Sequence, residues 1–185
     1  LTGSEAQKTE YLAKVLAGYR FGNAFSEAKS KTVTAFETRI RFEGDSAVLD
    51  GEKAYCTGAL FAHIVPVAGV DELNRPFIAF VPRETPGLQV IDSWDGFGQR
   101  QTDSGTVQFD NVFVDSSELL GPSGVSPRTT LRACLSQLIL TQLYLGNAQG
   151  ALDGALRYTR EHSRAWPASG VALASDDPFI QQRYG

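Results

Sequence analysis

The chain has 185 residues, 42% of them hydrophobic and 21% charged, and its formal net charge is −4. This is the composition of an ordinary globular protein and excludes a disordered or collagen-like chain. The sequence has no stripe of basic residues, so we expect no nucleic-acid partner. It also has no apolar run of the roughly 18 residues that cross a membrane, so we expect no membrane partner.

The first predicted element is a short helix over residues 4–17. Ser4 and Gln7 are spaced as a capping box, in which the hydroxyl and the amide satisfy each other's free backbone donors. Gly18 is placed to end the helix. The apolar side chains on one face of this helix are Tyr11, Leu12, Val15 and Leu16.

Residues 19–115 predict a series of short strands. Their hydrophobic pattern has a period of two, and turn-forming residues such as Asp50 and Gly51 separate the segments. Many short strands at regular spacing indicate a small antiparallel barrel or sandwich. The expected strands cover residues 32–36, 39–42, 47–49, 64–65, 77–81, 88–90 and 106–114.

Residues 128–164 predict one long helix, because apolar residues recur at helical spacing and no proline interrupts them. At 1.5 Å per residue it would be about 55 Å long, which is too long for the core of a small domain. We therefore expect it to pack in a bundle, in part against another subunit. Gly146, Gly150 and Gly154 recur every four residues and either permit close helix contact or mark a kink.

The last predicted element is a second helix near the end of the chain. Pro167 ends the long helix, and the run from Ser175 to Pro178 is typical of a new helix with proline in its first turn. The chain starts at Leu1, contains no methionine and stops inside this expected helix. We therefore expect it to be an internal part of a longer polypeptide.

The few cysteines and histidines do not form a metal or disulfide pattern. Cys56 and Cys134 lie far apart, and His63 and His162 lack the spacing of paired ligands. The first residues lack the basic and then apolar stretch of a secretory leader. We expect a cytoplasmic, reduced protein without a metal site.

Three polar, glycine-rich segments interrupt the predicted strands, at residues 21–27, 49–59 and 94–106. The second contains GEKAYCTG at residues 51–58, which resembles the G-x-K-x-W-I-T-N motif of acyl-CoA dehydrogenases, with Tyr55 and Thr57 at the flavin-contacting positions. The third contains GQRQTDS at residues 98–104, which resembles the family's G-x-R-x-S-x-T motif. The sequence is thus similar to the acyl-CoA dehydrogenase superfamily over essentially its whole length.

This resemblance implies an α+β fold, with an antiparallel β-barrel or sandwich middle domain flanked by helical segments. It divides the chain into the end of an N-terminal helical domain (1–18), the middle β domain (19–121) and the start of a C-terminal helical bundle (122–185).

Two departures point to the reduced-flavin monooxygenase branch of the family. FGNAFSE at residues 21–27 stands in place of the family's T-E-P-x-x-G-S-D segment, and Gly58 replaces the asparagine of the strand motif. WDGFGQRQTDSG at residues 94–105 and SRAW at residues 163–166 are also similar to that branch, which includes dibenzothiophene and sulfur-acquisition enzymes.

The resemblance implies that Asn23, Thr57, Trp94 and Ser104 line a flavin and that Arg164 reaches a flavin phosphate, across a subunit boundary. Each also has a plain structural reading. A threonine is common in strands, asparagine, serine and tryptophan are common beside turn glycines, and an arginine near a helix end complements the helix dipole.

The implied function is a two-component flavin-dependent monooxygenase. A separate reductase supplies reduced FMN, and O2 oxygenates a small molecule that contains sulfur, nitrogen or carbon as the reacting atom. The family's dimer of dimers is the expected homo-oligomer, and the catalytic residue would lie outside this chain. The alternatives are an FAD-dependent acyl-CoA dehydrogenase and, more remotely, a non-enzymatic oligomeric binding module.

Overall fold

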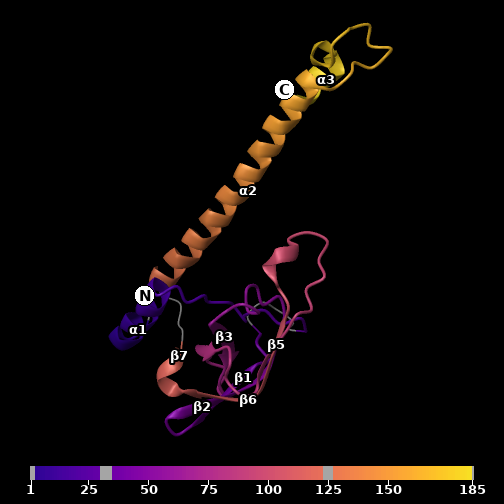
Figure 1. Cartoon of the computed structure of the whole chain (residues 1–185). Coiled ribbons are helices and arrows are strands. Elements are labelled where there is room, and N and C mark those ends of the chain that lie inside the picture. Colours follow the sequence, from indigo (N-terminus) through magenta and orange to yellow (C-terminus); the bar gives the residue numbers. More distant parts are fainter. Residues whose placement is uncertain (1–2, 30–34, 123–126, 185) are drawn as a thin grey trace. The chain divides into compact units, whose positions relative to one another are not determined.

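The structure is a computed structural model that describes residues 3–29, 35–122 and 127–184. The chain divides into two compact units, Leu1–Gly124 and Val125–Gly185. The first unit contains helix α1 (Glu5–Leu16) and the strands, and the second contains α2 (Pro127–Glu161) and α3 (Pro178–Tyr184) (Figure 1). Strands and long helix thus occupy separate stretches of the chain, which is the α+β class that the sequence predicts.

The strands of the first unit form one mixed sheet in the order β5-β6-β2-β1-β3-β4-β7. Five neighbouring pairs are antiparallel, and β1 and β3 are parallel. The strands are β1 (Arg39–Glu43), β2 (Ser46–Lys53), β3 (Ile64–Val70), β4 (Pro76–Pro82), β5 (Leu88–Ile91), β6 (Thr106–Asp115) and β7 (Leu119–Leu120).

Two details of the predicted sheet are corrected. A wholly antiparallel sheet is wrong because β1 lies between β2 and β3, so the crossover after β2 brings β3 back in the direction of β1. A closed barrel is also not formed, since β5 and β7 are the edges of the sheet in the described part of the chain. Of the strand expected at residues 32–36, residues 32–34 lie outside the described residues and residues 35–36 are not in a strand.

The core lies on one side of this sheet. β3 is buried at every position, whereas β4 and β6 alternate between buried and more exposed residues, as the period of two predicts. The crossover between β2 and β3 also joins the core, because Cys56, Ala59 and Ala62 are buried with the strand residues. This crossover is therefore packed tightly onto the sheet, although its sequence is that of a loop.

Helix α1 begins as the capping box predicts. Ser4 accepts from the backbone N–H of Gln7, whose side chain accepts from the backbone of Ser4. The amide of Gln7 also donates to the carbonyl oxygens of Ser117 and Leu119, at 2.5 and 3.0 Å. The cap thus serves a second purpose that its sequence does not show, which is to join the helix to the end of the sheet.

The second unit consists mainly of α2, which has 35 residues and ends three residues before the predicted boundary. α2 continues without a break through Gly146, Gly150 and Gly154, so no kink occurs there (Figure 1). Among the described residues, no helix is long and apolar enough to cross a membrane. Helix α3 begins at Pro178, as predicted, and the buried carboxylate of Asp177 accepts from the N–H of Phe179 at 2.9 Å.

Short 3-10 helices complete the description: η1 (Arg100–Thr102), η2 (Ser116–Glu118) and η3 (Ala174–Asp176). Of these, η1 matters most for the candidate site. It precedes β6, and the hydroxyl of its last residue, Thr102, contacts that of Ser104.

Candidate functional site

Thr57 lies in the turn that follows β2, and not in a strand as the motif comparison suggests. Its side chain is exposed, and its carbonyl oxygen accepts from the N–H of Asn23 at 3.2 Å. The chain leaves the strand at Lys53, and Tyr55 adopts a left-handed backbone conformation with φ of 57°. This reversal turns Thr57 toward solvent beside the segment that carries Asn23.

The segment around Asn23 is held against β3 by two parallel bridges, one on each side of that residue. Gly22 permits the approach, because a Cβ there would lie 2.8 Å from the Cα of Ala59. Asn23 itself is partly exposed, and its side-chain amide has no hydrogen-bond partner among the described residues. It is therefore free to bind a ligand beside Thr57.

Ser104 joins Thr57 through its side chain. The hydroxyl oxygens of Thr57 and Ser104 are 2.9 Å apart, and those of Ser104 and Thr102 are also 2.9 Å apart. Thr102 in turn donates to the carbonyl oxygen of Gln99 at 3.0 Å. Thr57, Ser104 and Thr102 form a continuous row of hydroxyls, called the hydroxyl chain below.

Trp94 is anchored to the same carbonyl as the hydroxyl chain. Its indole N–H donates to the oxygen of Gln99 at 2.9 Å, and its ring lies over Gly96, where a Cβ would be 2.5 Å from the ring. Because the indole N–H already has an acceptor, Trp94 can offer a ligand only the face or edge of its ring. Asn23, Thr57, Trp94 and Ser104 are thus linked by hydrogen bonds within one unit, directly or through Thr102 and Gln99.

The hydroxyl chain is uncharged, and Asp103, which stands between Thr102 and Ser104 in the sequence, is buried. The Asp103 carboxylate accepts from the N–H of Leu60 at 2.9 Å. Burial raises the pKa of Asp103, and the nearby Asp92 raises it further. The hydrogen bond from the Leu60 N–H and the charge of Arg83 lower it, but by less. Burial likewise raises the pKa of the Cys56 thiol to about 12.

Arg100, in η1, is exposed and makes no ion pair among the described residues.

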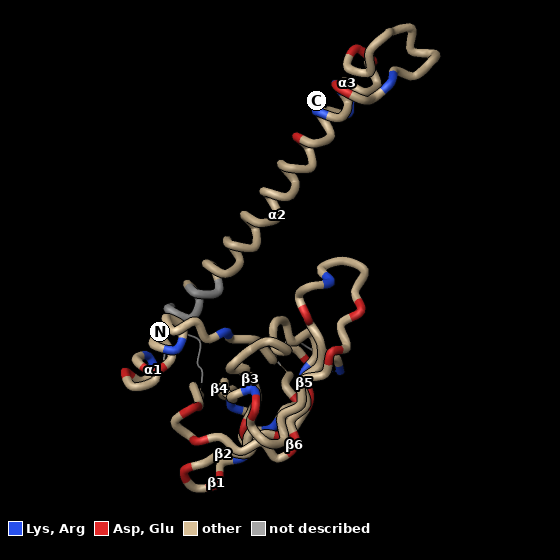
Figure 2. Tube along the Cα trace, in the orientation of Figure 1, with Lys and Arg blue, Asp and Glu red and all other residues tan. Residues whose placement is uncertain are grey.

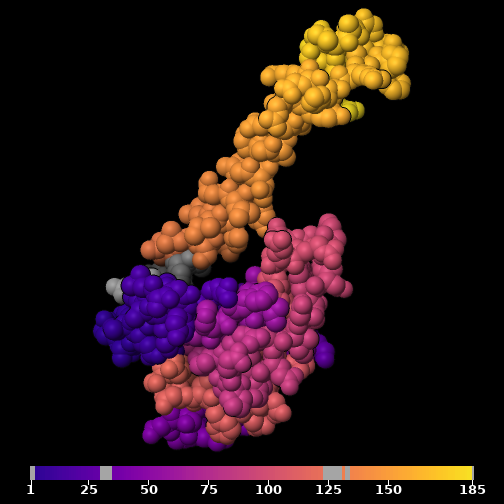
Figure 3. Space-filling view, in the orientation of Figure 1, coloured from indigo at the N-terminus to yellow at the C-terminus, as the bar shows by residue number. Residues whose placement is uncertain are grey.

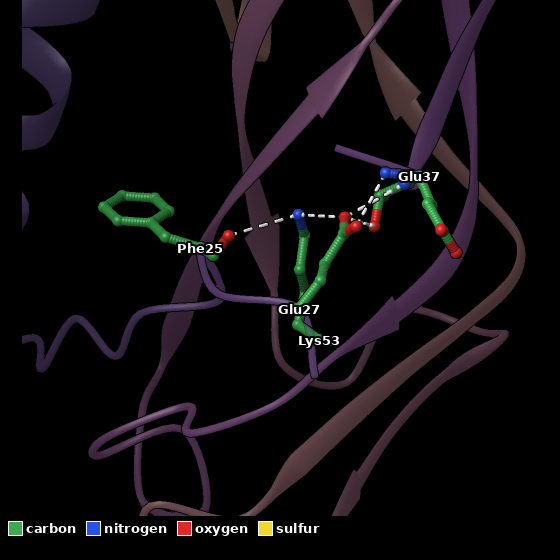
Figure 4. A network of polar contacts seen from close by, with 5 residues as sticks. Phe25, Glu27, Glu37 and Lys53 are labelled. Carbon is green, nitrogen blue, oxygen red and sulfur yellow. Dashed lines mark hydrogen bonds and ion pairs between the residues drawn. The ribbon is translucent and has the colours of Figure 1, made fainter. Parts of the chain in front are cut away.

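A buried ion pair lies behind this surface and was missed from the sequence. The Lys53 Nζ is 2.6 Å from Glu27 Oε1, and the two side chains are 0% and 5% exposed. Figure 4 shows the Lys53 ammonium between the Phe25 carbonyl and the Glu27 carboxylate. Glu27 also accepts from the backbone N–H of Glu37 at 2.6 Å and that of Thr38 at 3.0 Å. Both charged residues stand in segments that the sequence singles out, but nothing in their spacing shows that they meet.

The ion pair connects the two segments that carry Asn23 and Thr57. Glu27 follows Asn23 by four residues, and Lys53 precedes Thr57 by four. Between them, the Ala54 N–H donates to the Ser26 carbonyl at 2.8 Å. A buried pair of this kind fixes geometry more than it adds stability.

Arg164 belongs to the second unit and is not part of the hydrogen-bonded group described above. It forms a bridge with Leu173 and lines a groove of about 700 Å³. The same groove is lined by Trp166, Phe179 and Arg183. The groove thus contains two guanidinium groups, which can bind anions, together with two aromatic rings and Asp177. No group of three or more potential metal ligands lies close together within the described ranges.

Part of the first unit matches a known protein family. Residues 24–112 match the family model of the acyl-CoA dehydrogenase middle domain, a range that includes Glu27, Lys53, Thr57 and Ser104. The chain therefore contains an acyl-CoA dehydrogenase middle domain.

The particular relatives are monooxygenases. The chain is 36% identical to a dibenzothiophene monooxygenase of Rhodococcus qingshengii, an alignment that covers 100% of this chain and 48% of that protein. It is 35% identical to a probable FMNH2-dependent monooxygenase, SfnC, of Pseudomonas putida, over 89% of this chain and 41% of that protein. The FMN-bound structure of TdsC from Paenibacillus sp. A11-2 is similar to this fold with a TM-score of 0.82 and 35% identity, over 100% of this chain and 49% of that one. The chain thus spans about half the length of the relatives it matches.

Proposed function

We propose that the protein is a flavin-dependent monooxygenase that uses reduced FMN and O2 to oxygenate a small, sulfur-containing molecule. The observation that carries the proposal is that hydrogen bonds link four uncharged residues, Asn23, Thr57, Trp94 and Ser104, directly or through Thr102 and Gln99. Four residues from three separate segments are expected to meet in this way if they serve one ligand. The monooxygenases among its relatives favour this activity over an FAD-dependent acyl-CoA dehydrogenase.

The residues present fit a flavin ring. The edge of an isoalloxazine carries nitrogen and oxygen atoms that accept or donate hydrogen bonds, and neutral hydroxyl and amide groups can bind them without adding charge. The hydroxyl of Thr57 and the free amide of Asn23 would bind this edge, while the Trp94 ring would cover part of a face. When bound, reduced FMN supplies the electrons for the reaction with O2.

The rest of the chain has supporting roles in this proposal. Arg164 would bind the flavin phosphate from the second unit of another subunit, in a homo-oligomer that we propose to be a dimer of dimers. The chain would contribute the end of an N-terminal helical domain (1–18), a middle domain (19–121) and the start of a helical bundle (122–185). We place the protein in the cytoplasm, where a separate reductase would supply FMNH2.

A binding and turnover experiment tests the function. The intact natural polypeptide that contains this sequence is titrated with FMN and, without oxygen, with dithionite-reduced FMN. It is then mixed with a flavin reductase, NADH, O2 and dibenzothiophene. We expect flavin binding and a sulfoxidised product. Failure to bind either form of FMN would contradict the proposal, and oxidation of an acyl-CoA thioester with bound FAD would support the dehydrogenase instead.

A further inference from the structure

The crossover between β2 and β3 (residues 54–63) is bound to the segment just before β6 through alternate backbone N–H groups. Those of Cys56 and Gly58 donate to backbone carbonyl oxygens of that segment, at 2.9 and 3.2 Å. The next N–H in this series, that of Leu60, donates instead to a side chain, at 2.9 Å from Asp103 Oδ2. The Asp103 carboxylate thus takes the place of a backbone carbonyl in this series.

The backbone of Asp103 also turns in a way that few residue types tolerate. Its φ is 50°, in the left-handed region, where Asp and Asn are the side chains adopted more readily than most. The residue directly after this turn is Ser104, whose hydroxyl lies 2.9 Å from that of Thr57 on the crossover. One residue therefore contributes both the turn and the side-chain bond that hold the two segments together.

The bond to Leu60 needs an acceptor oxygen and not a charge. A carboxamide has nearly the shape of a carboxylate, and its oxygen also accepts hydrogen bonds. Burial raises the pKa of Asp103, so ionisation of this carboxyl opposes folding at neutral pH. The position of the oxygen is thus the property of Asp103 that the contact uses.

We infer that Asp103 is a positioning residue for the flavin, because its side-chain oxygen fixes the crossover against the segment before β6 and so holds Thr57 beside Ser104. This rests on the proposed function, which assigns Thr57 and Ser104 to the flavin site. The Asp103 oxygen is directed to the Leu60 N–H and acts on the ligand only through the two segments that it joins. Flavin affinity should therefore depend on the shape of residue 103 and not on its charge.

The test compares three substitutions of Asp103 in the intact natural polypeptide. Asp103→Asn keeps the position of the acceptor oxygen and removes the charge. Asp103→Glu keeps the charge and moves the carboxylate by one methylene group. Asp103→Gly suits the left-handed backbone and removes the acceptor. The readouts are the dissociation constants for FMN and for dithionite-reduced FMN, together with the melting temperature.

The matched control is Asp71→Gly. Asp71 is also buried, and its carboxylate accepts from the backbone N–H of Leu73 at 3.0 Å and from that of Arg75 at 2.8 Å. These bonds lie in the turn between β3 and β4, which carries none of the candidate flavin residues. The control should lower the melting temperature and leave both dissociation constants within about twofold of the wild type.

We expect Asp103→Asn to bind FMN within about twofold of the wild type and to melt no lower than it does. Asp103→Glu and Asp103→Gly should weaken binding about tenfold, the effect of about one hydrogen bond. If Asp103→Gly does not fold, the comparison of Asp103→Asn with Asp103→Glu still decides between shape and charge.

Two results would overturn this inference alone. Weakening by Asp103→Asn as large as that by Asp103→Glu would show that the acceptor position is not what matters. Wild-type affinity in Asp103→Glu would show that the contact with Leu60 does not position the site. A wild-type protein that binds neither form of FMN would overturn the proposed function, and this inference with it.

Discussion

Removal of the exposed Thr57 hydroxyl should change ligand binding without changing the stability of the fold. Its side chain contacts Ser104 and solvent, so Thr57→Val should leave the melting temperature close to that of the wild type. We expect it to weaken the binding of reduced FMN about fivefold, because one hydrogen bond to the ligand is worth about 1 kcal/mol. Fluorescence titration under anaerobic conditions measures this, and a dissociation constant equal to that of the wild type would remove Thr57 from the site.

Glu27 makes the stability of the protein sensitive to acid. Burial opposes its ionised form, but the hydrogen bonds from Lys53 and from the backbone of Glu37 and Thr38 outweigh burial and hold the pKa of Glu27 below its usual 4.5. A carboxyl with a lowered folded pKa stabilises the fold above the unfolded pKa. That contribution is lost as the pH falls below about 4.5, through the folded value.

We therefore expect the free energy of unfolding to fall less steeply below about pH 4.5 in Glu27→Gln than in the wild type. At neutral pH the same variant should be less stable by about 3 kcal/mol, because it leaves the Lys53 ammonium buried without its counter-charge. Urea unfolding at a series of pH values measures both effects. Asp45→Asn, at an exposed turn, is the control. Parallel pH curves for the wild type and Glu27→Gln would show that Glu27 does not titrate as described.

At the scale of elements, the sequence leaves open whether the three glycines of α2 mark a kink or permit close contact with another helix. Gly146, Gly150 and Gly154 lie in an unbroken helix, and a Cβ at any of them would meet no atom within 4 Å in this chain. Since no kink occurs, close packing against another helix is the remaining reason for three residues that each weaken a helix by about 1 kcal/mol relative to alanine.

We expect the triple variant with alanine at Gly146, Gly150 and Gly154 to be more helical by circular dichroism but weaker in self-association. The added methyl groups stabilise the helix and also separate it from its neighbour. Sedimentation velocity over a series of protein concentrations measures the association. A variant that associates as strongly as the wild type would show that the glycines do not lie in a contact.

The elements themselves were predicted to different degrees. α1 and α3 begin where the capping box and Pro178 place them, and the main strands follow the alternating pattern. The crossover at residues 54–63 was not expected to join the core. Its burial depends on Cys56, Ala59 and Ala62 packing on strands that lie elsewhere in the sequence, which no local pattern shows.

At the scale of the whole molecule, α2 carries an apolar surface that its own unit leaves uncovered. Residues 133–152 contain no charged side chain, and Figure 2 shows α2 without blue or red over most of its length. On the face seen in Figure 3, no other segment of the second unit covers the middle of α2. The exposed apolar residues of this stretch are Leu135, Leu138, Ile139, Leu140, Leu143, Tyr144, Leu145 and Leu152.

Contiguous exposed apolar residues of this kind are typical of protein–protein contacts. We expect the protein to sediment as an oligomer and the double variant Leu138→Asp/Leu145→Asp to dissociate it, since two buried carboxylates would have no counter-charge. Asn147→Asp adds one charge at a polar position and should dissociate it less. A wild-type protein that sediments as a monomer would contradict the expected assembly.

The sequence by itself determined the local structure and the family. Caps, turns and the switch from a period of two to a helical period depend on residues a few positions apart, so they can be predicted in place. The glycine-rich motifs also identified Asn23, Thr57, Trp94 and Ser104 as candidates. Only the tertiary structure decided that Thr57 meets Ser104, that Glu27 pairs with Lys53, and that β1 and β3 are parallel. These contacts join residues 26 to 47 positions apart, and they form only because the sheet brings distant segments together as it buries its apolar face.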